Sequence, residues 1–218
     1  MPRVLEQEVM TDPASVQGYA AMTVNPPNLV DSFLIPRFQP NNSVFKMADL
    51  GCGPCGYHKE LYQRYPNATI DAYEASVPML VEAANYIEPQ KTALINSFLP
   101  DSNLPQATYD VVLSSMFLHQ LPDPMVNWNT IKQVGKPGAK FIVFDLLRVE
   151  DETACWNIVN GFTPNGTAAF KQDFVNTLRA SFIESEIIDQ LNQAGLSAII
   201  DKQEVYPGCI VVYIEGTL

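Results

Sequence analysis

Residues 44–56 read VFKMADLGCGPCG. The apolar first half of this stretch predicts a buried strand over Val44–Leu50. Glycines follow at positions 51, 53 and 56, and the apolar side chains from Tyr57 onward recur at helical spacing. A strand, a glycine-rich turn and a helix in this order bring backbone N–H groups and a helix N-terminus to one point. The stretch therefore predicts a ligand-binding turn in an α/β fold.

Strands and helices continue to alternate after this turn. A helix is expected to begin after the capping residue Ser76, and another over Met125–Val134. The strands are expected over Ala68–Glu74, Thr92–Ile95, Tyr109–Ser114 and Ala139–Asp145. The last of these is apolar on both faces, as a central parallel strand is. The alternation predicts a doubly wound, mostly parallel sheet with right-handed connections.

The two ends of the chain depart from this alternation. Residues 1–42 are rich in proline and predict an N-terminal cap with short helices over Ala14–Met22 and Asn28–Phe38. Residues 149–179 are helical in pattern and contain no strand, so we expect a lid inserted above the edge of the sheet. Residues 180–218 predict a helix that ends near Gly195, followed by a closing pair of strands. We expect residues 43–148 to be the α/β core of one domain over residues 1–218.

The composition limits the possible partners. The chain has 218 residues, of which 47% are hydrophobic, and its 13 Lys and Arg against 24 Asp and Glu give a net charge of −11. Such a charge disfavours nucleic acid and membrane surfaces as partners. Four cysteines do not make a disulfide scaffold. Because no signal peptide and no long apolar run are visible, we expect a cytoplasmic protein with reduced thiols.

The glycine-rich turn is compatible with several kinds of ligand. Gly51, Gly53 and Gly56 fit a dinucleotide fingerprint, but Asp49 would face a pyrophosphate unfavourably. Cys52-Gly53-Pro54-Cys55 matches the active-site tetrapeptide of thioredoxins, so a thiol–disulfide oxidoreductase that uses Cys52 and Cys55 is an alternative function. Thioredoxins, however, have Trp where this chain has Gly51.

A third interpretation rests on Asp49-Leu50-Gly51-Cys52-Gly53-Pro54, which resembles motif I of the class I S-adenosylmethionine-dependent methyltransferases. The resemblance is to small-molecule methyltransferases of the methyltransferase-11/25 type, and it continues in register. Glu74 matches the acidic residue that holds the ribose, and Asn96-Ser97-Phe98 matches the turn that contacts adenine. Residues 109–121 resemble motif IV. Cys55 replaces the third glycine of motif I, and Ser97 replaces the acidic residue common at the adenine turn.

The resemblance implies a Rossmann-like sheet of seven strands with an antiparallel last strand and a helical lid insertion. It also implies S-adenosylmethionine as cofactor and S-adenosylhomocysteine as product. The residues that it assigns to the cofactor are Tyr19, Asp49, Gly51, Cys52, Gly53, Glu74, Ala75, Met79, Ser97, Phe98, Ser114 and Met116. No metal is expected, because the chain has two histidines and few oxygen ligands at the ends of the predicted strands.

The candidates for catalysis lie after the later strands. His119 and Asp145 are the candidate general bases, although His119 is also consistent with a packing histidine. Arg148 and Trp156 are candidates for substrate binding. The alternative for Arg148 is a plain ion pair with Asp145, and the alternative for Trp156 is a place in a helix core. The sequence therefore predicts methyl transfer by in-line displacement to a small-molecule acceptor whose reacting atom is undetermined.

The residues after the fourth predicted strand bear on the kind of acceptor. Ser114-Ser115-Met116-Phe117 is not the Asn/Asp-Pro-Pro-aromatic signature of amino-directed nucleic-acid methylases. Asn25-Pro26-Pro27-Asn28 resembles that signature but lies before motif I. Besides the oxidoreductase, a protein that binds S-adenosylmethionine without turnover remains an alternative, and the expected state is a monomer or a homodimer.

Overall fold

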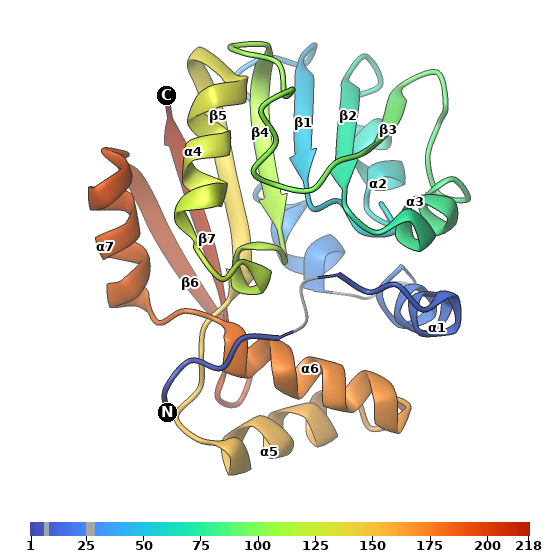
Figure 1. The fold of residues 1–218 in the computed structure, drawn as a ribbon, viewed down its shortest axis with the longest axis vertical. Coiled ribbons are helices and arrows are strands. Elements are labelled where there is room, and N and C mark those ends of the chain that lie inside the picture. Colours follow the sequence, from blue (N-terminus) through green and yellow to red (C-terminus); the bar gives the residue numbers. More distant parts are fainter. Residues whose placement is uncertain (7–8, 25–28) are drawn as a thin grey trace.

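The computed structural model describes residues 1–6, 9–24 and 29–218, and within these ranges seven strands form one sheet (Figure 1). The order across the sheet is β3-β2-β1-β4-β5-β7-β6. Neighbouring strands from β3 to β5 are parallel, whereas β7 is antiparallel to both β5 and β6. The predicted α/β fold with a mostly parallel sheet and an antiparallel last strand is confirmed. The strands are β1 (Lys46–Leu50), β2 (Thr69–Glu74), β3 (Thr92–Asn96), β4 (Tyr109–Ser115), β5 (Gly135–Leu146), β6 (Ala198–Tyr206) and β7 (Cys209–Thr217).

The connections create a crevice beside β1. The chain passes from β1 to β2 and β3 on one side, and then crosses back to β4 and β5 on the other. In open parallel sheets, ligands bind at the carboxyl ends of the strands where the order reverses in this way. The glycine-rich turn follows β1 and therefore lies at this switch point.

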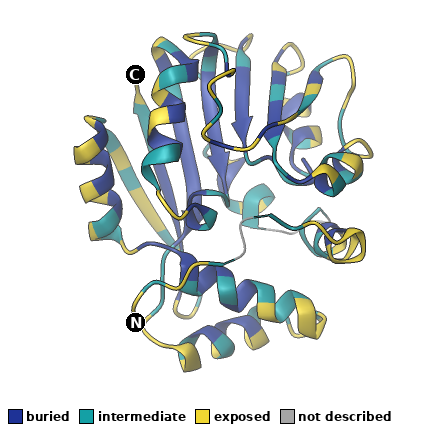
Figure 2. Cartoon of the chain, in the orientation of Figure 1, coloured by how far each residue is buried: buried dark blue, intermediate teal, exposed yellow. Residues whose placement is uncertain are grey.

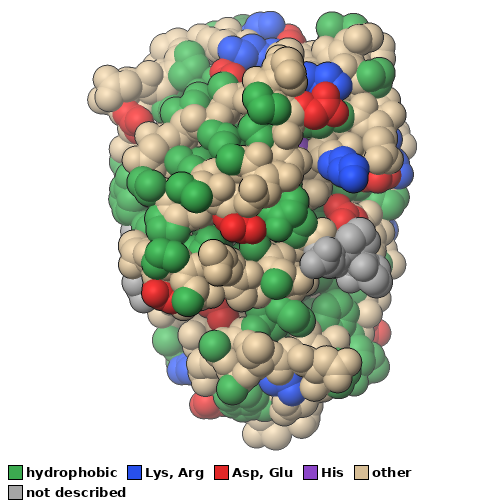
Figure 3. All heavy atoms as spheres, turned by 90° about the vertical axis from the view of Figure 1, so that its right-hand side faces the viewer, with side chains coloured by type: hydrophobic (Ala, Val, Ile, Leu, Met, Phe, Trp, Pro, Cys, Tyr) green, Lys and Arg blue, Asp and Glu red, His purple; other side chains and the backbone are tan. Residues whose placement is uncertain are grey.

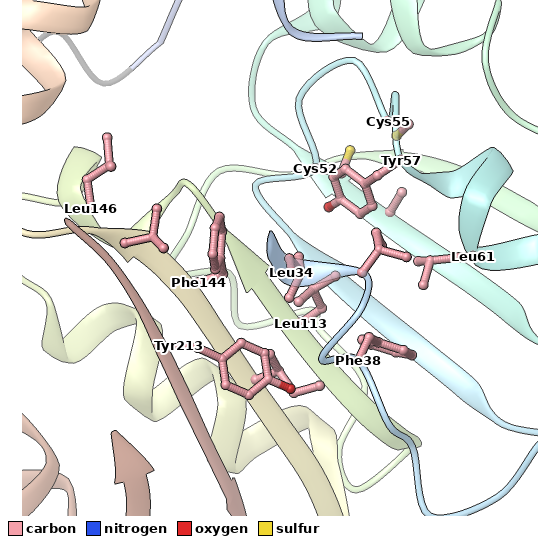
Figure 4. Close-up of a cluster of buried hydrophobic side chains, with 14 of the residues drawn as sticks. Leu34, Phe38, Cys52, Cys55, Tyr57, Leu61, Leu113, Phe144, Leu146 and Tyr213 are labelled. Atoms are coloured by element: carbon pink, nitrogen blue, oxygen red, sulfur yellow. The ribbon is translucent and has the colours of Figure 1, made fainter. Parts of the chain in front are cut away.

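Helices cover both faces of the sheet, and each face has its own core. On one face, Trp128 and Leu191 pack with strand residues such as Val112. On the other face, Leu61 packs with strand residues such as Leu113. Figure 4 shows part of this second core, and Figure 2 shows how fully the inner strands are buried. The helices are α1 (Pro13–Thr23), α2 (His58–Arg64), α3 (Val77–Ala83), α4 (Met125–Val134), α5 (Glu152–Phe162), α6 (Ala168–Ala180) and α7 (Glu184–Ala194).

Several element ends agree with the sequence patterns. The Ser76 side chain accepts a hydrogen bond from the Met79 N–H at 3.1 Å and so caps α3 as predicted. Helix α4 has the predicted bounds, and Gly195 ends α7 in a left-handed conformation. The closing strands were expected over Ser197–Lys202 and Cys209–Ile214, and both extend further, because the hairpin of β6 and β7 pairs along most of its length.

The N-terminal region differs more from the expectation. The first predicted helix is present as α1, but the second was expected over Asn28–Phe38, and Asn28 lies outside the described residues. The chain there forms a short π-helical turn, Val30–Leu34, and its Leu34 side chain is fully buried.

The segment predicted as a lid, residues 149–179, folds as α5 and α6, and α6 continues to Ala180. These two helices pack against each other and lie below the carboxyl ends of the strands in Figure 1. Helix α1 contacts both α3 and α6, so it borders the same region. No helix in the described ranges is long and apolar enough to cross a bilayer.

The side of the molecule over β3, α3 and α1 carries many hydrophobic side chains among scattered charged ones (Figure 3). Helix α3 buries Met79 and Ala83 against the rest of the protein. Its Val77 and Val81 side chains are 56% and 68% exposed. One stripe of this short helix thus faces the core, as its apolar spacing predicts.

The fully buried Leu113 of β4 tests the core. Replacing it with Ala removes apolar contacts and leaves a cavity, so Leu113→Ala is expected to lower the free energy of unfolding by about 2–5 kcal/mol. The measurement is urea unfolding followed by circular dichroism. The control is Ile199→Ala on β6, whose side chain is 68% exposed, and its effect is expected to stay within about 0.5 kcal/mol. Equal losses in the two variants would contradict the assigned core.

Candidate functional site

A cavity with a volume of about 410 Å³ lies at the carboxyl ends of the strands. We call it the main cavity. The glycine-rich turn, the end of β2 and the end of β4 form one side, and α1, the N-terminal segment and α5–α6 form the other. A smaller side cavity of about 30 Å³ shares Gly51 and Glu74 with it and is lined further by Ala75, Ser97 and Phe98.

Glycines bring the backbone of the turn close to the main cavity. Gly51 has a φ of +68°, and a Cβ at this position would overlap the ring of Phe117. Gly53 has a φ of +52°, and no atom lies within 4 Å of the position that its Cβ would occupy. Both conformations favour glycine. Because no atom fills the space beside Gly53, the backbone of the turn is open there.

Glu74 joins the end of β2 to this turn. Its Oε2 accepts a hydrogen bond from the Gly53 N–H at 3.0 Å, and its Oε1 accepts one from the Ser76 N–H at 2.8 Å. Burial raises the pKa of the Glu74 carboxyl, although these backbone hydrogen bonds oppose the shift. A carboxylate has about four acceptor positions, so two are left for a ligand in the cavities that Glu74 lines.

Asp49 lies beneath the turn. Its Oδ2 accepts hydrogen bonds from the Tyr57 hydroxyl at 2.6 Å and from the His58 Nε2 at 2.7 Å. Its Oδ1 is buried, and no described group is its hydrogen-bond partner. Burial opposes a charge on His58, but Cys55 and Asp49 outweigh this effect and raise its pKa to about 10. Asp49 is not among the described residues that line the main cavity.

Cys52 and Cys55 lie on the same turn, next to Tyr57 and above the core cluster in Figure 4. Both side chains are buried, and Cys52 lines the main cavity. Cys55, in the place of the third motif glycine, has a φ of +55°, a conformation that is uncommon for residues other than glycine. Its hydrogen bond with Cys52 lowers the pKa of Cys55 to about 7, whereas burial raises that of Cys52.

The side cavity contains the residues predicted for the adenine turn. Ser97 is buried, and its hydroxyl donates a hydrogen bond to Asp101 Oδ2 at 2.8 Å. Phe98 is 56% exposed. A carboxylate, that of Asp101, thus lies next to position 97, although Asp101 is not among the described residues that line either cavity. The spacing of the motif did not indicate Asp101.

His119 stands between two carboxylates at the main cavity. Its Nδ1 donates to Asp145 Oδ1 at 2.6 Å, and its Nε2 lies 3.2 Å from Glu6 Oε1. Burial opposes a charge on the imidazole, but Asp145 and Glu6 outweigh this effect and raise its pKa to about 10. At neutral pH His119 is therefore an imidazolium that donates to both carboxylates.

Asp173 on α6 is a further acidic group of the main cavity. Within the described ranges its carboxyl has no hydrogen-bond or ion-pair partner, in contrast to Glu6, whose Oε2 also accepts from the Thr177 hydroxyl at 3.4 Å. Burial and the nearby Glu6 carboxylate raise the pKa of Asp173 from 3.8 to about 6. The group is therefore mostly ionised at neutral pH but poorly solvated.

The structure brings most of the predicted cofactor residues to the two cavities. The main cavity is lined by Tyr19, Gly51, Cys52, Gly53, Glu74, Met79 and Met116, as well as by the catalytic candidate His119. The side cavity is lined by Ala75, Ser97 and Phe98. Met116 has a φ of +52°, a strained conformation at the end of β4 that the sequence did not indicate.

Besides Asp49, four predicted site residues line neither cavity in the described part of the chain. Ser114 is buried in β4, and its neighbour Ser115 faces the cavity instead. Asp145 lies behind His119. Arg148 pairs with Glu186 Oε1 at 2.8 Å and so joins the start of the 149–179 segment to α7. Trp156 packs on the hydrophobic core of the β1–α2 face.

Sequence reasoning missed Glu6, Asp173 and Ser115. Glu6 and Asp173 belong to segments without a recognisable motif, and only the fold brings them together. Ser115 was within reach of the sequence, because adjacent residues of a strand point to opposite faces. Among the described residues, no group of three or more His, Cys, Asp or Glu side chains is placed to hold a metal ion.

Part of the chain is similar in sequence to known methyltransferases. A family model for a methyltransferase domain matches residues 48–143. Trans-aconitate 2-methyltransferase from Mycobacterium ulcerans (strain Agy99) is 34% identical over 89 residues, which are 39% of this chain and 32% of that protein. The chain thus spans about a third of the length of the curated relatives that it matches.

Solved structures share the fold over nearly the whole chain. A SAM-dependent methyltransferase from Aquifex aeolicus superposes with a TM-score of 0.65 at 18% identity, covering 94% of this chain and 99% of that one. A phosphoethanolamine N-methyltransferase 2 from Haemonchus contortus, in complex with phosphomonomethylethanolamine and S-adenosylhomocysteine, gives 0.69 at 11% identity, covering 94% and 57%. At these identities the likeness concerns the fold alone.

The raised pKa of Asp173 predicts a pH-dependent gain in stability for Asp173→Asn. The folded state holds the Asp173 proton more tightly than the unfolded chain, so the wild type loses stability as the pH rises from about 4 to 6. Asn cannot ionise. The variant is therefore expected to be about 1–3 kcal/mol more stable than the wild type at pH 8 and nearly equal to it at pH 4.

Urea unfolding at both pH values measures this difference. The matched control is Asp189→Asn on α7, where the side chain is exposed, and its effect is expected to stay within about 0.5 kcal/mol at either pH. A gain for Asp173→Asn that does not depend on pH would rule out the electrostatic explanation.

Proposed function

We propose that the chain is a member of the class I S-adenosylmethionine-dependent methyltransferase superfamily and that it transfers a methyl group from S-adenosylmethionine to a small-molecule acceptor. The observation that carries the proposal is the junction of Gly53 and Glu74, where an open glycine backbone meets a buried carboxylate at the switch point of the sheet. A glycine turn that lacks basic neighbours but has acidic ones suits a cationic cofactor better than a pyrophosphate.

The residues present fit this cofactor. The open space beside Gly53 would admit it against the backbone. The unpartnered, buried Oδ1 of Asp49 lies beneath the turn and would act on the ammonium group of the cofactor through water. Glu74 would hold the ribose hydroxyls with its remaining acceptor positions, and Ser97 and Phe98 would border the adenine. When bound, S-adenosylmethionine would supply an electrophilic methyl carbon on a sulfonium ion and leave as S-adenosylhomocysteine.

The remainder of the main cavity would hold the acceptor. Tyr19 and Met116 line it near the turn, and α6 closes its far side. The role of these walls is to align the acceptor atom with the methyl carbon at near-contact distance and to exclude water. Such alignment contributes up to about 7–11 kcal/mol to lowering the barrier of a two-reactant step.

We propose that His119 and Asp145 act as a positioning pair in this cavity. A group with a pKa of about 10 is protonated at neutral pH and does not accept a proton from the acceptor. The imidazolium instead holds the carboxylate of Glu6 at the cavity wall. Arg148 and Trp156 are given no contact with the acceptor in this proposal, because both are engaged elsewhere.

We do not propose trans-aconitate as the methyl acceptor of this chain. A tricarboxylate needs basic partners, and the described lining of the main cavity contains neither Lys nor Arg. The matched region of those relatives is also only about a third of their length. The acceptor is thus proposed as a small molecule of a different charge.

The first prediction of this proposal concerns Glu74. Glu74→Ala removes the proposed ribose acceptor and the anchor of the turn, so it is expected to weaken S-adenosylhomocysteine binding at least about tenfold, measured by isothermal titration calorimetry. The matched control is Glu88→Ala, because Glu88 is exposed and pairs with Lys91 away from both cavities. If the wild type shows neither heat of binding nor a thermal shift with the cofactor product, the proposal is wrong.

A second prediction separates methyl transfer from thiol–disulfide exchange. Both thiols are buried, and exchange requires that a disulfide reach the attacking sulfur. The wild type is therefore expected to reduce insulin disulfides, in the presence of dithiothreitol, no faster than the Cys52→Ser, Cys55→Ser double variant. A reduction rate that depends on the two cysteines would favour the oxidoreductase alternative.

Turnover separates an enzyme from a protein that only binds the cofactor. Formation of S-adenosylhomocysteine that depends on an added acceptor supports the proposal. Tight binding without acceptor-dependent product for any acceptor class would leave the binding-only alternative.

A further inference from the structure

The acceptor side of the main cavity contains the carboxyl groups of Glu6 and Asp173, and the basic side chain among its described lining residues, His119, is paired with Glu6. Glu6 and Asp173 line it, whereas no Lys or Arg does so among residues 1–6, 9–24 and 29–218. The remaining positions, 7–8 and 25–28, are Gln, Glu, Asn and Pro, so the sequence adds no basic residue there. The charge of this region is therefore set by acidic groups.

The cations nearby are already engaged. The Arg3 guanidinium donates to the carbonyl oxygens of His119 and Leu121, both at 2.8 Å, and to that of Ala180 at 2.6 Å. Its Cζ lies 4.0 Å from the centre of the Phe182 ring. The His119 imidazolium is shared between Glu6 and Asp145, which leaves this group of three with one net negative charge. Within the described ranges, no Lys, Arg or His side chain forms an ion pair with Asp173.

Tyr19 lies beside Phe170 of α6 and is exposed to the same negative charge. Burial raises the pKa of its hydroxyl, and the carboxylates of Asp173 and Glu6 raise it further. A ligand with a positive charge would lower the energy of this arrangement, whereas an anionic ligand would raise it.

Ser115 gives an independent indication of a polar ligand. Its side chain lines the cavity at the end of β4 and is only 5% exposed. Its hydroxyl has no hydrogen-bond partner within the described part of the protein. Buried hydroxyl groups are normally satisfied, so this one is placed to accept or donate a hydrogen bond to a molecule in the cavity.

Aromatic rings form the apolar wall beside these groups. The rings of Tyr19, Phe170 and Phe174 follow one another with centroids 6.4 Å apart, and Phe162 lies 6.0 Å from Phe174. Such faces favour an apolar body, and they also attract a cation.

We infer that the methyl acceptor is a small amine that binds as an ammonium ion between Glu6 and Asp173, with its apolar body against the aromatic wall. Before transfer, the ammonium would give one proton to the Asp173 carboxylate. The freed nitrogen lone pair would then bond to the methyl carbon, and the carbon–sulfur bond would break with its electron pair staying on the sulfur of S-adenosylhomocysteine. Ser115 is the neutral hydrogen-bond partner on the opposite side. This inference rests on the proposed function, because the same cavity must also hold the cofactor.

The test compares three probes of similar shape and different charge. Phenethylamine, 2-phenylethanol and 3-phenylpropionate are titrated calorimetrically into the protein saturated with S-adenosylhomocysteine at pH 7.5. The amine is expected to bind at least about tenfold more tightly than either other probe. In Asp173→Asn this preference is expected to fall at least about fivefold, whereas the exposed control Asp189→Asn keeps it.

Equal or tighter binding of the alcohol or the carboxylate overturns the inference, and so does the absence of binding by all three probes. An amine preference that Asp173→Asn leaves unchanged overturns it as well. The prior titration with S-adenosylhomocysteine tests the proposed function separately from the acceptor class. Loss of that binding refutes the proposed function, whereas intact binding with the wrong charge preference refutes the acceptor class alone.

Discussion

The hydrogen bonds that fasten the glycine-rich turn to β2 determine the site. The N–H groups of Gly51 and Cys52 both donate to the Tyr73 carbonyl oxygen, at 2.9 and 3.1 Å, and the next N–H, from Gly53, donates to the Glu74 carboxylate. The turn must adopt left-handed conformations to make these bonds. The position of this turn determines where the cavity-lining residues on the sheet side lie. It also determines where Asp49, beneath the turn, meets Tyr57 and His58.

Much of the fold was predictable because local patterns control it. Alternating strands and helices indicated the parallel sheet, and the capping residue Ser76 fixed the start of α3. The strand–turn–helix spacing also located Gly53 and Glu74, since both occupy strand ends that a parallel sheet brings to one edge. These features depend on neighbours in sequence or on the regular geometry of a sheet. The strand lengths were less predictable, because pairing partners extend β5, β6 and β7.

The acceptor side was not predictable in the same way. Glu6 and Asp173 lie far apart in the chain, and neither stands in a motif. Arg148 resembled a substrate-binding group at a strand end, but Glu186, which is 38 residues away, forms an ion pair with it. The choice between Ser114 and Ser115 depended on which face of β4 meets the cavity. Each of these outcomes depends on a tertiary contact. A single sequence, read on its own, contains no signal for such a contact.

The position of β7 has a consequence for the order of assembly. In the described sheet, β6 pairs with β7 alone, and β7 in turn bridges β6 to β5. Because β6 is synthesised before β7, it has no partner until the hairpin forms, and the hairpin then adds to β5 as a unit. Between β5 and this hairpin the chain must already have built α5 and α6. The walls of the cavity and the completion of the sheet are therefore coupled in folding, so a change in either segment is expected to affect both.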